Sequence, residues 1–211
     1  MNEQQQQRRN QMIILLIAAM SAIPFGIAWL MKNNPNIIPR ESTNNGLLIT
    51  PVITTERSDL QGFDDFSIEH LKELNGHWVI MNIVPKNTCN KLCQDAIFKT
   101  KQLRLMMNKD LVRIRRAVLL MGKMDVNTWC PPKKNSNIKA GCWENDSRLL
   151  HIIPSQTMKQ NVITISNGKA IEGMLIIMDP LGNLMMQYES GFDPYKVKAD
   201  LKKLLRISQI G

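Results

Sequence analysis

The sequence predicts an α/β domain preceded by one N-terminal transmembrane helix. Residues 12–31 form an uncharged apolar run of 20 residues, and at about 1.5 Å per residue such a helix crosses a hydrocarbon core of about 30 Å. Farther along, apolar runs rich in β-branched residues alternate with segments of helical periodicity, which indicates a sheet covered by helices. The 211 residues suffice for one domain with a sizeable core in addition to the anchor.

The N-terminal apolar run is interpreted as an uncleaved anchor. A signal peptide has a shorter apolar stretch and a small-residue cleavage site, and Ala19–Ala22 offers a poor one. Arg8 and Arg9 precede the run, whereas only Lys32 follows it closely. The arginine pair also resembles a twin-arginine export signal, but the flanking charges explain it more simply. The positive-inside rule then places residues 1–11 in the cytoplasm and the domain outside it.

The formal net charge of +9 would suit a nucleic-acid-binding protein or a domain that lies against anionic lipid head groups. External placement argues against nucleic acid and leaves the membrane as a partner. One basic set is expected to be a solvated face, which lies against the membrane or docks an acidic partner. It comprises Lys99, Lys101, Arg104, Lys109, Arg113, Arg115 and Arg116.

The segment that follows the anchor, residues 32–45, is polar, contains two prolines and is expected to be an extended tether. The external domain then comprises residues 46–211. Its first strand is expected at residues 46–55, where Pro51 restricts it to a sheet edge or a bulge. Ser67–Leu74 predicts a short helix with Ser67 as its N-cap.

The centre of the domain is expected at Trp78–Val84, because its large and β-branched side chains are typical of a buried strand. Pro85 ends this strand. Thr88 is the expected N-cap of a helix that continues to about Asn108.

Two cysteines, Cys89 and Cys93, open that helix. A spacing of four residues puts both sulfurs on one helix face, one turn apart. Cys89 is expected in the first turn, where unpaired backbone N–H groups and the helix dipole favour a thiolate. A strand, a short loop and a cysteine pair that opens a helix predict a thiol-redox site or a soft-metal site. The alternatives are a structural disulfide and a relict pair.

The second half of the chain predicts further strands and a closing helix. The strands are Ala117–Met121, Arg148–Pro154, Gly173–Asp179 and Leu184–Tyr188, of which the last two form a hairpin. An irregular insertion is expected at Lys123–Ser147. Asp193 and Pro194 are the N-cap and first residue of a final helix. The order of strand, cysteine helix, strand, long connection, hairpin and terminal helix describes a thioredoxin-like α/β domain.

The insertion carries the remaining cysteines, Cys130 and Cys142. In an oxidising compartment a disulfide between them would close a polar loop and stabilise the fold by about 3 kcal/mol. Free thiols or a second metal pair are the alternatives. His151 is expected to be a satisfied core or surface histidine rather than a metal ligand. Most of the 14 methionines fall in apolar runs, which indicates core packing rather than copper handling.

On these residues the chain resembles the Sco/SenC family, membrane-anchored thioredoxin-like proteins that assist assembly of cytochrome c oxidase. More closely, it is similar to a divergent branch of small anchored proteins in proteobacteria. The resemblance rests on the anchor, on the strand and C-x-x-x-C motif of Trp78–Cys93, and on the MDPLGNL hairpin of Met178–Leu184 with its helix. It implies a bacterial inner-membrane protein whose main domain is periplasmic.

Members of that family bind copper through the two cysteines and a histidine ahead of the hairpin strand. Cys89 and Cys93 match this pattern, but no histidine follows His151, and Asn90 replaces the usual proline. Two thiolates without a third ligand make a linear and more labile Cu(I) site. Thiol–disulfide exchange requires only the cysteine pair.

The predicted function is therefore oxidase biogenesis by thiol–disulfide exchange, with Cys89 as nucleophile and Cys93 as resolving thiol. The substrate would be a respiratory oxidase subunit, through the oxidised cysteines of its copper site, or another redox protein. The same cysteines would alternatively serve a Cu(I) carrier, or remain oxidised in an inactive assembly scaffold.

Overall fold

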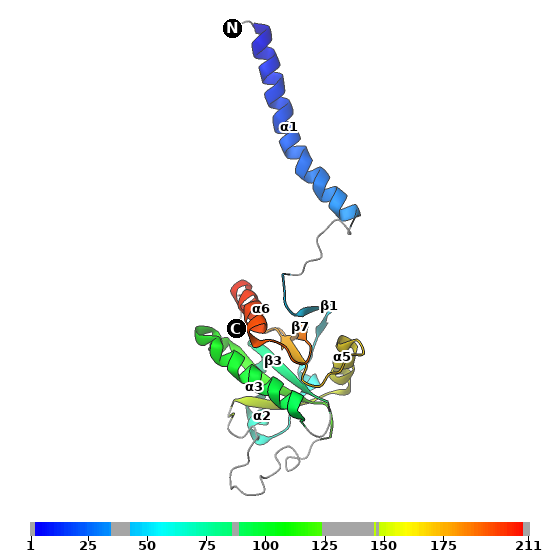
Figure 1. The fold of residues 1–211 in the computed structure, drawn as a ribbon, viewed down its shortest axis with the longest axis vertical. Helices are drawn as coiled ribbons and strands as arrows, with labels where there is room; N and C mark the ends of the chain where they lie inside the picture. Colours follow the sequence, from blue (N-terminus) through cyan, green and yellow to red (C-terminus); the bar gives the residue numbers. More distant parts are fainter. Residues whose placement is uncertain (1–2, 35–42, 86–88, 124–145, 147, 209–211) are drawn as a thin grey trace. The chain divides into compact units, whose positions relative to one another are not determined.

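The structure is a computed structural model that describes residues 3–34, 43–85, 89–123, 146 and 148–208. It divides into two compact units, Met1–Thr43 and Asn44–Gly211, and each is described by itself (Figure 1).

In the described part of the first unit there is a single helix, α1, which spans Glu3–Asn33. Its segment Gln6–Asn33 is long and apolar enough to cross a membrane, and none of its most apolar window is buried in the protein. An exposed apolar surface of this length is stable in lipid but not in water. The helix therefore has the dimensions of the predicted single membrane anchor.

The second unit is built on one seven-stranded sheet with the order β1-β7-β6-β3-β4-β5-β2. β3 is parallel to β4, and β4 is parallel to β5, whereas the other pairs are antiparallel. The strands are β1 (Leu47–Thr54), β2 (Leu60–Gly62), β3 (Trp78–Val84), β4 (Ile114–Leu120), β5 (Leu149–Pro154), β6 (Leu175–Met178) and β7 (Asn183–Tyr188).

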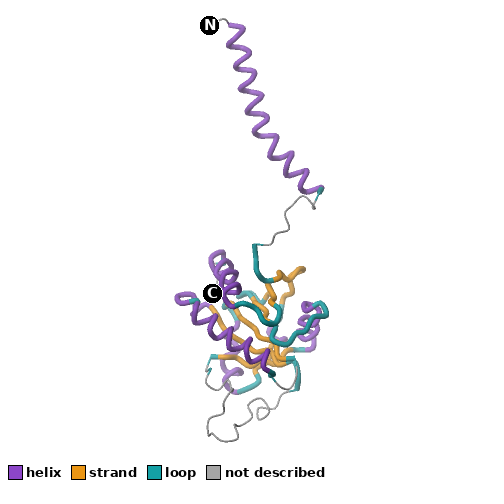
Figure 2. The backbone as a smooth tube through the Cα atoms, in the orientation of Figure 1, coloured by secondary structure: helices purple, strands orange, loops and turns teal. Residues whose placement is uncertain are grey.

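Helices cover both faces of this sheet (Figures 1 and 2). One face carries α3 and α6, and the opposite face carries α5. The helices of this unit are α2 (Asp65–His70), α3 (Lys91–Met106), α5 (Gln156–Ser166) and α6 (Pro194–Ile207), with short 3₁₀ turns η2 (Arg57–Asp59), η3 (Leu71–Leu74) and η4 (Asn108–Arg113). This is the predicted α/β thioredoxin-like class.

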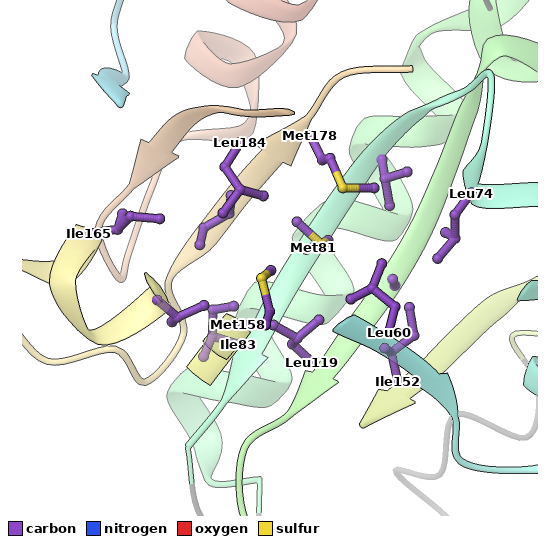
Figure 3. Close-up of a cluster of buried hydrophobic side chains, with 14 of the residues drawn as sticks. Leu60, Leu74, Met81, Ile83, Leu119, Ile152, Met158, Ile165, Met178 and Leu184 are labelled. Atoms are coloured by element: carbon purple, nitrogen blue, oxygen red, sulfur yellow. The ribbon is translucent and has the colours of Figure 1, made fainter. Parts of the chain in front are cut away.

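The central strand β3 is buried along its whole length, because helices cover both of its faces. Ile80 packs with α3 and α6, whereas its neighbour Met81 packs with α5 in the cluster of Figure 3. Alternate side chains of a strand point to opposite faces, so a strand covered on both sides reads as a continuous apolar run. The prediction for residues 78–84 is confirmed to the residue.

The hairpin of β6 and β7 and the closing helix α6 are also confirmed. The side chain of Asp193 caps α6 by accepting a hydrogen bond from the Tyr195 N–H. β1 lies at a sheet edge, as Pro51 predicted, and its pairing with β7 shifts between Leu48 and Ile53.

Two elements, β2 and α5, were not predicted, and the start of α2 was predicted wrongly. The N-cap of α2 is Asp64 rather than Ser67, because the Asp64 carboxylate accepts a 2.7 Å hydrogen bond from the Ser67 N–H. Ser67 is instead buried, and its hydroxyl accepts a hydrogen bond from the His151 N–H.

A buried carboxylate, Asp200 of α6, binds the first residues of this unit through hydrogen bonds. Asp200 Oδ2 accepts hydrogen bonds from the Asn45 N–H at 2.7 Å and the Gly46 N–H at 3.0 Å. The Tyr188 hydroxyl donates a third bond at 2.9 Å. These hydrogen bonds hold the pKa of Asp200 below its usual value although burial opposes ionisation. The chain that arrives from residues 34–43 is thus fixed to α6.

Candidate functional site

The predicted cysteine pair lies where β3 ends and α3 begins. β3 ends at Val84, and α3 begins at Lys91 after its N-cap Asn90. The Asn90 side chain accepts a 3.1 Å hydrogen bond from the Cys93 N–H. The prediction of Thr88 as N-cap is therefore wrong, because Asn90, a stronger capping residue, occupies that position.

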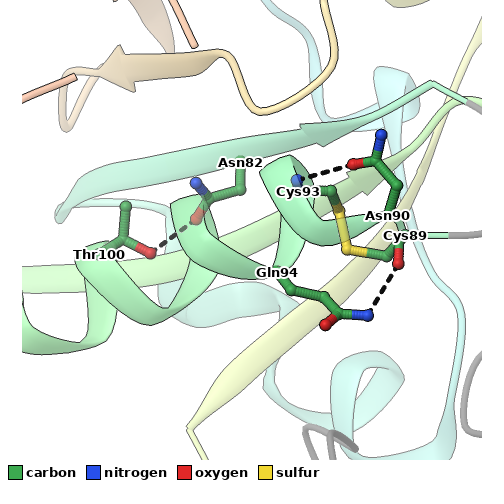
Figure 4. Close-up of a disulfide and its surroundings, with 6 residues drawn as sticks. All are labelled: Asn82, Cys89, Asn90, Cys93, Gln94 and Thr100. Atoms are coloured by element: carbon green, nitrogen blue, oxygen red, sulfur yellow. Dashed lines mark hydrogen bonds between the residues drawn. A yellow bond between two sulfur atoms is a disulfide. The ribbon is translucent and has the colours of Figure 1, made fainter. Parts of the chain in front are cut away.

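With Asn90 as the N-cap, both cysteines occupy different helix positions from those predicted. Cys89 precedes the N-cap and lies outside the first turn, whereas Cys93 lies inside it. The two are joined by a disulfide with a Cα–Cα distance of 5.3 Å (Figure 4), which is normal for such a bond. The Gln94 side-chain amide donates a 2.9 Å hydrogen bond to the Cys89 carbonyl and holds that residue against the helix.

The two sulfur-bearing residues differ in accessibility. Cys93 is 1% exposed, and Cys89 is partly exposed. Cys93 belongs to a small apolar cluster, against which Cys89 and Phe63 pack. The other members of that cluster are Val84, Ile97, Val118, Leu120 and Leu149. An incoming protein therefore reaches Cys89 before Cys93.

The carboxyl ends of two parallel strands form the base of this site. The register of β3 and β4 pairs Val84 with Leu120, and the Met121 N–H donates a 2.9 Å hydrogen bond to the Val84 carbonyl. In α/β proteins the carboxyl ends of parallel strands are the usual place for functional sites.

The loop before β6 packs against the first turn of α3. Gly173 has φ +73°, and a Cβ atom on it would lie 3.1 Å from the Leu92 carbonyl oxygen and 2.9 Å from Ser190 Oγ. Only glycine combines this backbone conformation with so close an approach. Gly173 therefore lets the loop lie directly beside the turn that carries Cys93, a feature that sequence reasoning missed.

A buried polar network supports α3 from beneath. The Thr100 hydroxyl lies 2.7 Å from Asn82 Oδ1, and Arg116 donates to the Ile97 carbonyl at 2.8 Å. Arg116 also pairs with Asp146 and is only 2% exposed. The prediction that Arg116 belongs to a solvated face is wrong, because the strand periodicity of β4 points this side chain toward α3.

Three other residues were considered in the sequence as possible parts of a site: His151, Cys130 and Cys142. His151 pairs with a carboxylate through one ring nitrogen, because its Nδ1 lies 2.6 Å from Asp64 Oδ2. Burial lowers the pKa of His151, and the Asp64 carboxylate opposes that shift only partly. Within the part of the chain that the structure describes, no three His, Cys, Asp or Glu side chains gather as a metal site. Cys130 and Cys142 lie outside the described residues.

The chemistry available to the pair follows from its position. The first turn of α3 contains no acidic residue, so the helix dipole there is not opposed by a carboxylate. Backbone N–H groups at a helix start stabilise thiolates. When reduced, the site would hold the Cys93 thiol in that turn and present an accessible thiol at Cys89 within bonding distance of it.

Comparison with known proteins agrees with this architecture. A family model described as "Transmembrane-like, thioredoxin-like, C-terminal domain" matches residues 78–208. No curated protein matches the chain.

Several solved structures resemble it in fold. Apo Sco1 from Thermus thermophilus is 12% identical with a TM-score of 0.46, and the match covers 78% of this chain and 99% of that one. Copper-bound ScoI from Arabidopsis thaliana is 14% identical with a TM-score of 0.43, covering 65% and 89%. The thioredoxin domain of a thiol-disulfide oxidoreductase from Bacteroides vulgatus is 15% identical with a TM-score of 0.42, covering 77% and 99%.

Proposed function

Because the chain belongs to the family of transmembrane-like, thioredoxin-like C-terminal domains, we propose that it is a membrane-anchored protein for thiol–disulfide exchange. The observation that carries this proposal is the Cys89–Cys93 disulfide at the start of α3. One of its residues is accessible and the other is buried, which is the asymmetry that a two-step exchange requires.

In the reductive direction the Cys89 thiolate attacks one sulfur of a partner's disulfide. A mixed disulfide forms, and the partner's other cysteine leaves as a thiolate. The Cys93 thiolate then attacks Cys89 Sγ, which forms the Cys89–Cys93 disulfide and releases the partner with two thiols. Two electrons pass to the partner, and the reverse sequence oxidises it.

Cys89 remains the proposed nucleophile, but the support is now its accessibility rather than its predicted position in the first helical turn. Its predicted place in the first helical turn belongs to Cys93 instead. Accessibility now supports the assignment, because a buried Cys93 thiol cannot meet a folded partner first. Cys93 remains the resolving residue.

The biological setting is the finer part of the proposal. The arginines ahead of the apolar run of α1 and the sequence resemblance to Sco/SenC proteins support a bacterial inner-membrane anchor with a periplasmic domain. The same resemblance supports oxidase biogenesis, with the cysteines of a copper-site apoprotein as substrate. Residues 130 and 142 are proposed as a structural disulfide that takes no part in exchange.

A Cu(I) carrier that uses the same sulfurs is the second candidate, since the pair alone supplies two soft ligands. Copper would then be cargo. The described residues offer no cluster of three potential ligands, so exchange is the function that the geometry supports better.

The exchange proposal is tested with the full chain and its single serine variants. Cys93→Ser should accumulate a mixed disulfide with a model disulfide substrate through Cys89, whereas Cys89→Ser should not. The pair should also equilibrate with glutathione at a potential within the range of oxidoreductases, about −120 to −270 mV. A potential below about −300 mV with no trapped adduct would indicate an inactive scaffold.

A Cu(I) competition titration of the reduced chain separates the second candidate. Wild type should bind no more tightly than expected for two thiolates, and Cys89→Ser/Cys93→Ser should bind less. Tight binding at one equivalent that depends on this pair would favour the carrier.

A further inference from the structure

A second charged site lies far from the cysteines, in a groove between η4 and the end of α6. The groove encloses about 460 Å³ and is lined by five cations and one carboxylate. The charged residues are Lys109, Asp110, Arg113, Lys202, Lys203 and Arg206. Such an excess of positive charge in a concave surface favours an anionic occupant.

The groove has a base held by hydrogen bonds and exposed cations at its rim. The Arg113 guanidinium donates to the Leu205 carbonyl at 3.0 Å and to the Ser208 carbonyl at 2.9 Å, which holds it at the end of α6. Lys109 and Lys202 are exposed, as expected for long side chains that extend their ammonium groups outward.

Two exposed apolar residues are next to these cations in the sequence. Val112 precedes Arg113 and is 66% exposed, and Ile207 follows Arg206 and is 77% exposed. Exposed apolar residues among lysines and arginines are typical of surfaces that lie in the head-group region of a bilayer.

The covalent path of the chain limits how far the second unit can lie from the end of α1. Only ten residues, 34–43, connect the end of α1 to the second unit, and ten residues span at most about 36 Å. The second unit begins at Asn45 and Gly46, which Asp200 of α6 holds. Lys203, which lines the groove, lies 3.6 Å from Asp200 Oδ1. The groove is thus next to the point where the tether joins the domain.

We propose that this groove binds the head groups of anionic phospholipids in the same bilayer that α1 crosses. The inference rests on the membrane anchor of the proposed function but not on its redox chemistry. Each Lys or Arg near an anionic surface favours docking by about fivefold, so several cations together, assisted by the short tether, hold the domain against the bilayer.

Docking in this way would direct the cysteine pair away from the lipid. η4 follows the end of α3, whereas Cys93 lies in its first turn. The 16 residues of α3 separate these two ends by about 24 Å. The reactive pair would face extramembrane domains of neighbouring proteins.

The same cations would also be present if they served only to stabilise the negative end of the α6 dipole. That role does not depend on lipid composition, whereas head-group binding does. The composition of the bilayer therefore separates the two explanations.

The test uses the full chain in nanodiscs of phosphatidylcholine alone or mixed equally with phosphatidylglycerol. Lysine acetylation rates are measured by mass spectrometry. Lys109 and Lys202 should react about fivefold more slowly in the anionic bilayer, and high salt should reverse the effect. The exposed Lys72 and Lys91, on other elements, are internal controls and should react equally in both.

Charge reversal provides the matched variants. Lys202→Glu/Arg206→Glu should abolish the slowing at Lys109, whereas Lys72→Glu/Lys91→Glu should preserve it. Equal rates for groove and control lysines in both bilayers would overturn the proposal. If the chain does not insert into nanodiscs at all, the anchor itself fails and this inference fails with it.

Discussion

Replacing Asp200 with alanine should lower the free energy of unfolding of the external domain by about 4 kcal/mol. The side chain is fully buried and accepts bonds from two buried donors, the Gly46 N–H and the Tyr188 hydroxyl. Leaving a buried donor without its acceptor costs about 1–3 kcal/mol, so the two together cost about 2–6 kcal/mol. Two further bonds from Asn45 are only partly buried and can be replaced by water.

The measurement is urea unfolding of the full chain in detergent, followed by near-UV circular dichroism. Asp200→Asn preserves the shape of the side chain and should cost less than Asp200→Ala. Tyr188→Phe removes one donor but leaves the carboxylate its other partners, so it should cost about 1 kcal/mol. A loss below 1 kcal/mol for Asp200→Ala would refute the role assigned to this carboxylate.

The pH dependence of the same variants supplies an independent check. The pKa of Asp200 is lowered in the folded protein, so its stabilising effect is complete above the unfolded pKa of about 3.9. That effect is lost as pH falls through the lower folded pKa. The stability difference between wild type and Asp200→Asn should therefore be constant near neutral pH and shrink below about pH 4. A difference that grows on acidification would contradict the assignment.

Three further predictions concern the site and its surroundings. Gly173→Ala should cost about 2–3 kcal/mol, because left-handed backbone strain of about 1–2 kcal/mol adds to the close contact with Leu92. Gly191→Ala is the matched control, because Gly191 has φ +80° but no atom within 4 Å of an added Cβ. In the same unfolding assay it should lose only the free energy of the backbone strain. Asn90→Ala should cost about 1 kcal/mol through loss of the helix cap, and an unchanged urea midpoint would contradict this. Because the pKa of His151 is lowered in the folded protein, the imidazole takes up a proton at a higher pH in the unfolded chain than in the folded one. The free energy of unfolding should therefore fall as pH drops below about 6.5. In His151→Gln the free energy of unfolding should depend less steeply on pH over the same range.

The parts of the fold that were predicted correctly carry local signals. β3 was found because burial on both faces makes its sequence continuously apolar. α6 was found because Asp193 and Pro194 are both favourable at a helix start. Neither required knowledge of distant contacts.

Two elements were missed for different reasons: β2 is defined by its pairing with another strand, and the apolar pattern of α5 is obscured by polar neighbours. β2 has only three residues, so its pairing with β5 rather than its own pattern defines it. α5 is capped by Ser155, and its buried Met158, Val162 and Ile165 have helical spacing, a signal that the surrounding Gln, Thr and Asn residues obscured.

The site itself was predicted in identity but not in geometry. Cys89 and Cys93 are joined as a pair, yet the choice between Thr88 and Asn90 as cap decides which of them enters the helix. Arg116 was assigned to a charged surface because it follows other basic residues. Its true position follows from alternation with Ile114 and Val118, which share its side of β4.

Both outer strands of the sheet resist pairing with another copy. β1 contains Pro51, which has no N–H to donate in strand pairing, and β2 at the other edge is only three residues long. An anchored protein diffuses in a plane, where copies meet far more often than they would in an equal volume of solution. Because neither edge strand pairs readily with another chain, these collisions are less prone to produce aggregates joined by strand pairing. The domain is thereby suited to a crowded two-dimensional environment.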